Sequence, residues 1–271
     1  MLVRSWNLFH GNTVPPQRRA FLAEMIRLAM ADEPDILCVQ EVPAWALGQF
    51  TLGDVAARPV VGPLPITARI GRALTDAHHG VLRSAFAGQG NALQLSSRLR
   101  VLDHRVLTLN SRRFRNDQAR TLGLGFVARL AWAKERRIVQ AARLAAPDGR
   151  TLVVANMHCT SYAADQRLTE AELLRAAWFA SSLAQPEDVQ VLAGDFNVTA
   201  AGSQTLRDLS GPEWGFSAPG PGIDHILVRG AAATPVRRWP DERRARGNRL
   251  LSDHAPVELE IEAKVEGEGE A

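Results

Sequence analysis

The sequence predicts an α/β fold in which two β-sheets pack face to face and helices lie outside them. Short segments with the composition of strands recur along most of the chain and outnumber the amphipathic segments typical of helices. The turn residues Pro147-Asp148-Gly149 join two such strands, which favours antiparallel connections. No linker rich in Gly, Ser or Pro divides the 271 residues, so we expect one domain over residues 1–263.

The first third of the chain contributes two strands and a helix to this fold. A strand is expected over residues 2–8, where apolar and polar side chains alternate. A helix is expected over residues 16–31, because Leu22 and Met25 begin a series of apolar residues at helical spacing. The continuous apolar run at 36–39 is typical of a strand that is covered on both faces.

The rest of the chain follows the same two patterns. A long helix is expected over residues 165–184, with Leu168, Leu173 and Trp178 mostly on one side. Residues 189–193 form another continuous apolar run, which indicates a buried strand. Further strands are expected over residues 92–95, 100–109, 137–145, 151–157, 223–228, 234–239 and 255–262, and further helices over 43–50 and 70–86.

The net charge of +3 conceals an asymmetry along the chain. Residues 257–271 carry six Glu and one Lys, so residues 1–256 have a net charge of about +8. A basic surface of this size suits a polyanionic partner, and it is equally consistent with a solvated surface that has no partner. The acidic end at 264–271 is expected to be disordered.

Cysteine content and hydropathy indicate a cytoplasmic protein. Cys38 and Cys159 are the only cysteines, too few for a disulfide framework or a cysteine zinc site, and both lie in apolar, strand-like runs. No apolar run approaches the ~20 residues that cross a bilayer, and residues 1–10 lack the pattern of a signal peptide. We expect a monomer without a transmembrane segment, and the sequence indicates no protein partner.

The reaction chemistry is suggested by polar side chains at the ends of apolar strands. Each alone has an ordinary structural interpretation, because Asp and Asn favour turns and most single histidines are not catalytic. Together they supply what phosphodiester hydrolysis needs, namely metal ligands, a base for water and donors to the phosphate. The set is Asn7, Glu41, His158, Asp195, Asn197, Asp224, Asp253 and His254.

Roles follow from the chemistry of each group. Mg²⁺ prefers oxygen ligands, which Glu41 and Asp253 can supply. Asp195 can take a proton from water and Asn197 can orient that water, since residues two apart in an extended segment point the same way. The two histidines, when protonated, can donate to phosphate oxygens.

The order and wording of these motifs resemble the endonuclease/exonuclease/phosphatase superfamily, the DNase I-like metal-dependent phosphoesterases. The matching stretches span residues 5 to 256, nearly the whole chain. They are Ser5-Trp6-Asn7, Asp35-Ile36-Leu37-Cys38-Val39-Gln40-Glu41, Gly90-Asn91-Ala92, Asn156-Met157-His158, Gly194-Asp195-Phe196-Asn197, Ile223-Asp224-His225-Ile226 and Ser252-Asp253-His254-Ala255-Pro256.

This resemblance implies a four-layered DNase I-like α/β sandwich, in which two mixed β-sheets pack face to face with helices outside. It also implies a Mg²⁺ cofactor, with Mn²⁺ as a substitute. Glu41 would be the principal metal ligand, with Asn7 and Asp253 close to the metal.

The resemblance assigns the remaining residues to the water and the phosphate. Asp195 and Asn197 would position or activate the water, and His158 and His254 would contact the scissile phosphate. Asp224 would orient His254. That pairing is chemically reasonable, because a carboxylate on one imidazole nitrogen fixes the tautomer and raises the pKa.

Two departures bear on the substrate. The abasic-site endonuclease branch has Asn where this chain has His158, with a Tyr before it, whereas the only tyrosine here, Tyr162, comes after. The chain therefore looks more like the branch shared by DNase I, sphingomyelinases and inositol-phosphate phosphatases. Residues 42–90 match no pattern, and such loops set substrate choice in the family.

Two basic stretches are candidates for contact with a polyanion. One contains Arg112, Arg113, Arg115 and Arg120, and the other is the segment 237–249, with six Arg and two acids. The second reads as a loop just before Ser252-Asp253-His254. It either follows a nucleic-acid backbone or is only solvated, with its tryptophan packed on the protein. Its candidate substrate-binding residues are Trp239, Arg243, Arg244 and Arg246.

Other interpretations of single motifs are weaker. A Ser-His-Asp hydrolase is disfavoured, because the adjacent residues Ser252-Asp253-His254 can scarcely converge and no Gly-x-Ser-x-Gly segment occurs. His78-His79 reads as a surface pair, since neighbours on a helix do not share a face. A non-catalytic binding module is disfavoured by the complete set of site residues. We therefore expect a Mg²⁺-dependent phosphoesterase, either a nuclease acting on DNA or RNA or an enzyme acting on a small or lipid phosphoester.

Overall fold

The computed structural model describes residues 1–16, 21–58 and 88–263. The expected helix at 70–86, the pair His78-His79 and the acidic end at 264–271 lie outside these residues. Within the described part of the chain, no helix is long and apolar enough to cross a membrane. Cys38 and Cys159 are both buried and form no disulfide.

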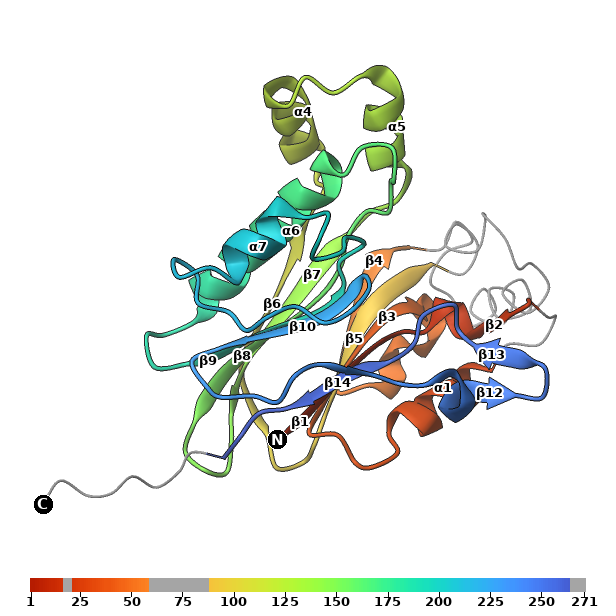
Figure 1. Ribbon diagram of the computed structural model, residues 1–271, viewed down its shortest axis with the longest axis vertical. Coiled ribbons are helices and arrows are strands. Elements are labelled where there is room, and N and C mark those ends of the chain that lie inside the picture. The colour runs from red at the N-terminus through yellow and green to blue at the C-terminus, as the bar shows by residue number, and fades with distance from the viewer. Residues whose placement is uncertain (17–20, 59–87, 264–271) are drawn as a thin grey trace, which may run out of the picture.

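Strands dominate the described structure (Figure 1). They are β1 (Leu2–Asn7), β2 (Thr13–Val14), β3 (Ile36–Pro43), β4 (Leu52–Ala57), β5 (Gln89–Leu95), β6 (Arg100–Thr108), β7 (Ile138–Ala145), β8 (Thr151–His158), β9 (Val189–Asp195), β10 (Asp224–Arg229), β11 (Arg237–Arg238), β12 (Ala245–Arg246), β13 (Arg249–Leu251) and β14 (Val257–Glu260). The α-helices are α1 (Leu22–Ala29), α4 (Arg112–Thr121), α5 (Phe126–Lys134), α6 (Arg167–Leu183) and α7 (Gln204–Leu209), and the 3₁₀ helices are η1 (Phe9–Gly11), η2 (Ala44–Gln49) and η3 (Asp241–Arg244).

Two mixed sheets form the body of the molecule. The order is β11-β14-β1-β3-β5-β4 in the six-stranded sheet and β10-β9-β8-β7-β6 in the five-stranded sheet, and a small third sheet joins β12, β13 and β2. Each main sheet contains one parallel pair, β1 with β3 and β8 with β9, flanked by antiparallel neighbours. The two main sheets thus repeat the same sequence of strand directions.

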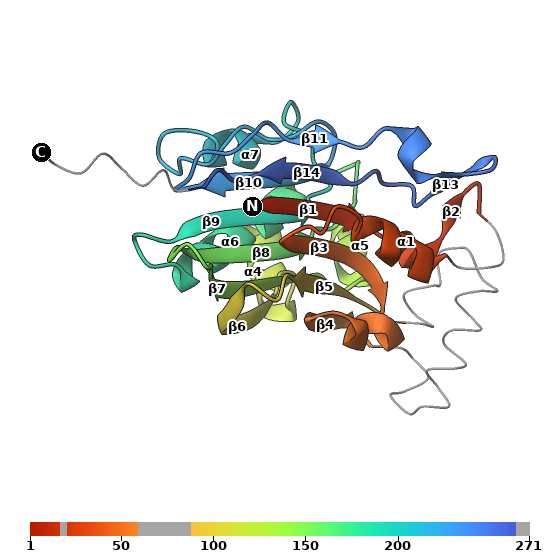
Figure 2. The ribbon, with the colours of Figure 1, turned by 90° about the horizontal axis from the view of Figure 1, so that it is seen from below.

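Three apolar layers separate four layers of structure. The middle one lies between the two sheets and includes Val3, Leu93, Val154 and Val191, all almost fully buried. A second apolar layer packs α6 and α7 on the five-stranded sheet, and a third packs α1 and η2 on the six-stranded sheet. Figure 1 shows α6 and α7 on one side of the two sheets and α1 on the other, and Figure 2 shows the strands of each main sheet in their order. The predicted sandwich of two mixed sheets with helices outside is confirmed.

The chain builds the two sheets in different ways. The five-stranded sheet comes from one continuous stretch, residues 100–229, whereas the six-stranded sheet combines strands from both ends of the chain. The described ends meet where β1 pairs with β14 in the interior of this sheet, and the amino group of Met1 donates to the carbonyl of Ile261 at 2.7 Å.

Strand register determines where the polar strand ends meet. In the parallel pairs, Asn7 lies beside Gln40, and His158 lies beside Asp195. Asp224 lies on the other side of Asp195, across the antiparallel pair of β9 and β10. The carboxyl ends of both parallel pairs therefore present polar residues at the same end of the sandwich.

Several elements differ from the sequence-based expectation. The helix expected over 43–50 is the 3₁₀ helix η2, and the strands expected over 234–239 and 255–262 are confined to β11 and β14. The sequence did not predict α4, α5, α7, β2, β4, β12 or β13. The basic stretch at 112–120 lies on α4, which is strongly polar and has too few apolar residues to have been predicted as a packed helix. Tertiary contact supplies its support, since Phe114 packs edge-on against Trp132 of α5.

Candidate active site

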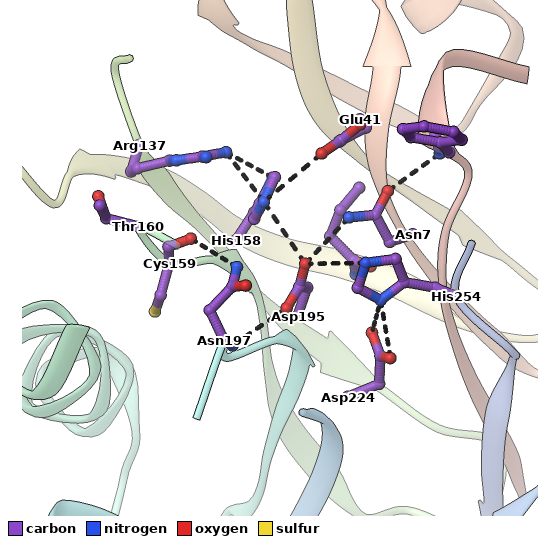
Figure 3. A network of polar contacts seen from close by, with 12 residues as sticks. Asn7, Glu41, Arg137, His158, Cys159, Thr160, Asp195, Asn197, Asp224 and His254 are labelled. Atoms are coloured by element: carbon purple, nitrogen blue, oxygen red, sulfur yellow. Dashed lines mark hydrogen bonds and ion pairs between the residues drawn. The ribbon is translucent and has the colours of Figure 1, made fainter. Parts of the chain in front are cut away.

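Asp195, the last residue of β9, lies at the centre of a polar cluster (Figure 3). Its Oδ2 accepts a hydrogen bond from Asn7 Nδ2 at 3.0 Å. The same oxygen lies 3.5 Å from His158 Nε2 and 3.7 Å from His254 Nε2. Because Asn7 belongs to one main sheet and His158 to the other, the cluster sits where the two sheets meet.

Gly194 allows Asp195 to lie so close to β8. It has a φ of +140°, and a Cβ added to it would lie 1.9 Å from the carbonyl oxygen of Met157. Only glycine permits that approach. The Gly194-Asp195 pair in the sequence motif therefore has a backbone reason as well as a chemical one.

Glu41 reaches the cluster because β3 is bulged. The pairing of β3 with β5 shifts register between Val39 and Val42, and Glu41 has a φ of +51°. Bulges commonly re-aim a side chain beside an active site. The carboxylate of Glu41 lies 3.8 Å from His158 Nε2 and 3.6 Å from His10 Nε2. Glu41 thus lies on the same side of the sandwich as the other site residues.

His254 is held through its backbone and its ring. Its backbone N–H donates to Ser252 Oγ, and the hydroxyl of Ser252 donates to the carbonyl of Asn7. The indole N–H of Trp6 donates to the carbonyl of His254 at 2.8 Å. On the ring, Nδ1 donates to both carboxylate oxygens of Asp224, at 2.8 and 3.0 Å. Its Nε2 is therefore directed toward Asp195.

The two histidines differ in protonation. Burial alone would lower the pKa of His254, but the hydrogen bond to Asp224 and the charge of Asp195 raise it to about 10. In contrast, burial and the neighbouring Arg137 hold the pKa of His158 well below its usual range. His254 is therefore an imidazolium at neutral pH and His158 is neutral. The condition for donation by a protonated imidazole is therefore met by His254 and not by His158.

Asp195 has the properties of a group that exchanges protons near neutral pH. Burial and the neighbouring charge of Asp224 raise its pKa to about 7, against the opposing effects of His254 and Asn7. A carboxylate with such a pKa is suited to take a proton from water.

Asn197 comes to the cluster by a different route from the one the sequence suggests. It lies beyond the end of β9 with a φ of +55°, so the argument from an extended segment is wrong. Its backbone N–H donates to Asp195 Oδ1 at 3.0 Å, and its side-chain amide donates to the carbonyl of Cys159 at 2.9 Å. A turn, rather than a strand, places it next to Asp195.

The oxygen donors of the cluster fit a divalent cation. Burial and the nearby charge of Glu41 raise the pKa of Asp253, so these carboxylates repel each other in the absence of a cation. Oxygen ligands of this kind suit Mg²⁺. A second group, formed by Asp195, Asp224 and His254, has ligand atoms that all lie within 4.8 Å of one another.

Two further residues touch the cluster that the sequence analysis did not single out. The Nη1 of Arg137 lies 2.9 Å from both ring nitrogens of His158, and its Nη2 pairs with Glu135 at 2.8 Å. His10 lies beside Glu41 in η1. The only sequence signal for the arginine is its place in Arg136-Arg137, directly before β7.

The basic loop at 237–249 does not have the geometry of a nucleic-acid track. Trp239 is only 4% exposed, and the guanidinium of Arg4 stacks on its ring, so its proposed role as a base-stacking platform is wrong. Arg244 is buried and donates to the carbonyls of Leu251 and Ser252. The other two candidates form ion pairs, Arg243 with Asp32 and Arg246 with Glu24.

Comparison with known proteins agrees with the fold and the site. The model of the Endonuclease/Exonuclease/phosphatase family matches residues 5–254. A search of curated proteins finds no match.

Solved structures share the fold at low sequence identity. An endonuclease/exonuclease/phosphatase from Bacteroides vulgatus is 17% identical with a TM-score of 0.61, over 96% of this chain and 98% of that one. The human Nocturnin catalytic domain with bound sulfate is 17% identical with a TM-score of 0.60, over 97% and 93%. A humanized D. rerio TDP2 is 14% identical with a TM-score of 0.59, over 97% and 99%. Because the family model spans nearly the whole chain, this protein belongs to the endonuclease/exonuclease/phosphatase family and is a phosphoesterase.

Proposed function

We propose that this phosphoesterase is a Mg²⁺-dependent nuclease that hydrolyses phosphodiester bonds of DNA or RNA. The observation that carries the proposal is the single cluster around Asp195. A carboxylate with a pKa near 7, an imidazolium and a set of acidic oxygens lie within a few ångströms of one another there. Metal-assisted attack of water on a phosphodiester requires these three elements together.

Each residue has a distinct part in this proposal. Glu41, with Asn7 and Asp253, would hold Mg²⁺, which when bound neutralises charge on the phosphate. Asp195 accepts the proton of the attacking water, and Asn197 orients that water.

The histidines and Asp224 act on the phosphate in the proposed mechanism. His254, kept protonated by Asp224, donates through Nε2 to a phosphate oxygen as negative charge develops. Neutral His158 accepts a hydrogen bond from Arg137 and lines the recess beside Glu41.

A nuclease is preferred to an enzyme for small esters because an exposed arginine borders the site and could contact a further phosphate of a longer substrate. The recess beside Glu41 and His158 is also lined by Asn91, Arg136 and Arg137, and Arg136 is exposed. An enclosed pocket would favour a small ester. The alternative is a phosphatase or phosphodiesterase acting on a small or lipid phosphoester, of the inositol phosphate or sphingomyelin type.

A substrate panel tests the proposal directly. Plasmid DNA, single strands, RNA, inositol phosphates and sphingomyelin are each incubated with Mg²⁺ and with EDTA. We expect Mg²⁺-dependent cleavage of at least one nucleic acid. Cleavage of inositol phosphates or sphingomyelin alone would overturn the nuclease assignment in favour of the alternative.

The first predicted variant, Glu41→Gln, tests the metal ligand. It keeps the size of the side chain and removes the charge, so hydrolysis should fall by roughly a hundredfold or more while the fold is retained. Glu187→Gln, an exposed change of the same kind, is the control. Circular dichroism checks folding. Native turnover by Glu41→Gln at limiting Mg²⁺ would show that Glu41 is not the principal ligand.

A further inference from the structure

A second basic pocket lies next to the active site. It has a volume of about 310 Å³ and is lined by three arginines, Arg112, Arg115 and Arg136, together with Thr108 and Ser111. Ser111 and Arg112 belong to the start of α4, and Arg136 follows α5. The pocket therefore lies at α4 and α5, two helices that the sequence analysis did not predict, beside the end of β6.

No carboxylate among the described residues pairs with these three arginines. Arg136 donates only to the hydroxyl of Thr108, at 2.7 and 3.1 Å, and Arg115 donates to the carbonyl of Trp132 at 3.2 Å. Burial and the charge of Arg112 lower the pKa of Arg115, although Glu172 opposes this effect. The pocket thus concentrates positive charge, and no carboxylate of the described residues neutralises it by direct contact.

The loop arginines are a useful contrast. Arg243 and Arg246 pair with carboxylates of α1 and its following turn, and Arg244 pairs with Asp241. Their charges are already compensated within the protein. An external anion is attracted less strongly there than by arginines that have no acidic partner.

The pocket adjoins the active site. Arg136 lines both this pocket and the recess that contains Glu41 and His158. The next residue, Arg137, contacts His158 directly. One pair of adjacent arginines therefore connects the reacting centre to the neighbouring pocket.

We propose that this pocket binds a second, non-scissile phosphate of the substrate. The inference rests on the proposed function, in which the substrate is a nucleic-acid strand, and it assigns a neighbouring phosphate of that strand to Arg112, Arg115 and Arg136. Guanidinium groups form paired hydrogen bonds with phosphate oxygens. The first turn of α4 also opens onto the pocket, and the Ser111 side chain does not cap it, so its N–H groups add to the positive potential.

Binding away from the reacting bond affects affinity more than chemistry. A contact made equally in the ground state and the transition state lowers KM and leaves kcat unchanged. Removing the contact should therefore raise KM for substrates with several phosphates, and should leave turnover of a substrate with a single phosphate unaltered.

The test compares two double variants with matched charge change. Arg112→Gln/Arg136→Gln removes two lining residues, and Arg100→Gln/Arg113→Gln removes two exposed arginines that do not line the pocket. Binding of fluorescein-labelled single-stranded oligothymidylate is measured in EDTA over a range of salt concentrations. We expect the first variant to bind about tenfold more weakly, with a log–log salt slope reduced by about 1.4, since each lost contact to a single strand contributes about 0.7. The second variant should bind like the wild type.

A kinetic readout separates this inference from the proposed function. Hydrolysis of bis(p-nitrophenyl) phosphate, which carries one phosphate, should be unchanged in the single variant Arg112→Gln, because Arg112 lines this pocket and not the recess beside Glu41 and His158. Arg112→Lys/Arg136→Lys should recover part of the oligonucleotide affinity. Equal oligonucleotide affinity and KM in wild type and Arg112→Gln/Arg136→Gln would overturn the inference. If the substrate panel identifies an inositol polyphosphate instead, and its KM rises in the same variant, the second-phosphate pocket stands and the nuclease assignment fails.

Discussion

At the scale of single residues, the site depends on two imidazoles held in opposite protonation states. Asp224 and Asp195 keep His254 charged, whereas burial and Arg137 keep His158 neutral. A site with two imidazolium ions would repel Arg137 and demand more acidic partners. The neighbouring strands thus set the charge of each ring through the side chain that they place beside it.

The first residue-scale prediction concerns pH. A raised histidine pKa means that the charged form persists as pH rises and is lost only near pH 10. Asp224→Asn removes the carboxylate that holds the proton, so the pKa of His254 should fall toward its ordinary value. The alkaline limb of the kcat/KM profile should then move to lower pH by more than about one unit. An unchanged alkaline limb would show that His254 does not act as the charged donor.

The second residue-scale prediction concerns Gly194. Replacement by Ala adds a Cβ that would lie 1.9 Å from the Met157 carbonyl oxygen, at a φ of +140°. We expect the free energy of unfolding to fall by about 3 kcal/mol or more, from strain and backbone displacement together. Gly149→Ala is the control, because Gly149 has a positive φ but nothing within 4 Å of an added Cβ, and it should cost about 1 kcal/mol. Urea unfolding of both variants measures the difference, and equal losses would contradict the close-approach argument.

The sequence predicted which polar side chains lie together, because each is next to an apolar strand and that is a signal within a short segment of sequence. Examples are Asn7, Glu41, Asp195 and His254. Arg137 escaped prediction for a physical reason. Its contact with His158 depends on β7 lying beside β8, and nothing within the Arg136-Arg137 segment records that pairing.

At the scale of elements, the loop before β14 supports the site through the backbone of Ser252. Arg244 in η3 donates to the carbonyls of Leu251 and Ser252, and its guanidinium also pairs with Asp241. Ser252 in turn positions the backbone of His254. The motif Ser252-Asp253-His254 therefore relies on a buried arginine some eight residues earlier in the chain.

Arg244→Ala tests this supporting role. Its removal leaves buried carbonyl oxygens without donors, and each such oxygen costs about 1–3 kcal/mol. We expect a loss of unfolding free energy of roughly 2–4 kcal/mol together with reduced kcat, because the His254 backbone loses its support. Arg246→Ala removes a more exposed ion pair with Glu24 and should cost under about 1 kcal/mol. A comparable loss of oligonucleotide affinity in Arg244→Ala and Arg246→Ala, with stability unchanged in both, would restore the loop as a substrate track.

Element prediction succeeded where apolar residues were many and failed where they were few. The strands β3 and β9 are continuous apolar runs, and α6 buries Leu168 and Leu173, although Trp178, expected on the same side, is exposed. In α4 only Phe114 and Ala119 are apolar, and the helix is held by its contact with α5. The phosphate pocket proposed above lies at this unpredicted pair of helices.

At the scale of the whole molecule, the two sheets differ in how far apart their strands lie in sequence. The five-stranded sheet joins strands from residues 100–229, whereas β1 pairs with β14 across almost the full length of the chain. Pairings between distant segments form late, since closing a long loop costs more conformational entropy.

Refolding should therefore proceed sheet by sheet. In pulsed hydrogen exchange during refolding, we expect amides of β7, β8 and β9 to gain protection before those of β1 that pair with β14. Mass spectrometry of peptic fragments distinguishes the two groups. The amides of the β1–β3 pair, whose strands lie closer together in the sequence, serve as an internal reference. Simultaneous protection of both groups would show a single concerted step.

The position of His254 near the end of this topology bears on how the enzyme is made. During synthesis from the amino terminus, Asn7, Glu41 and Asp195 emerge long before the segment that carries the imidazolium. The segment that carries His254 takes its place only when β14 can pair with β1. The contact between His254 and Asp195 therefore cannot form until both the first strand and the strand after His254 have been made.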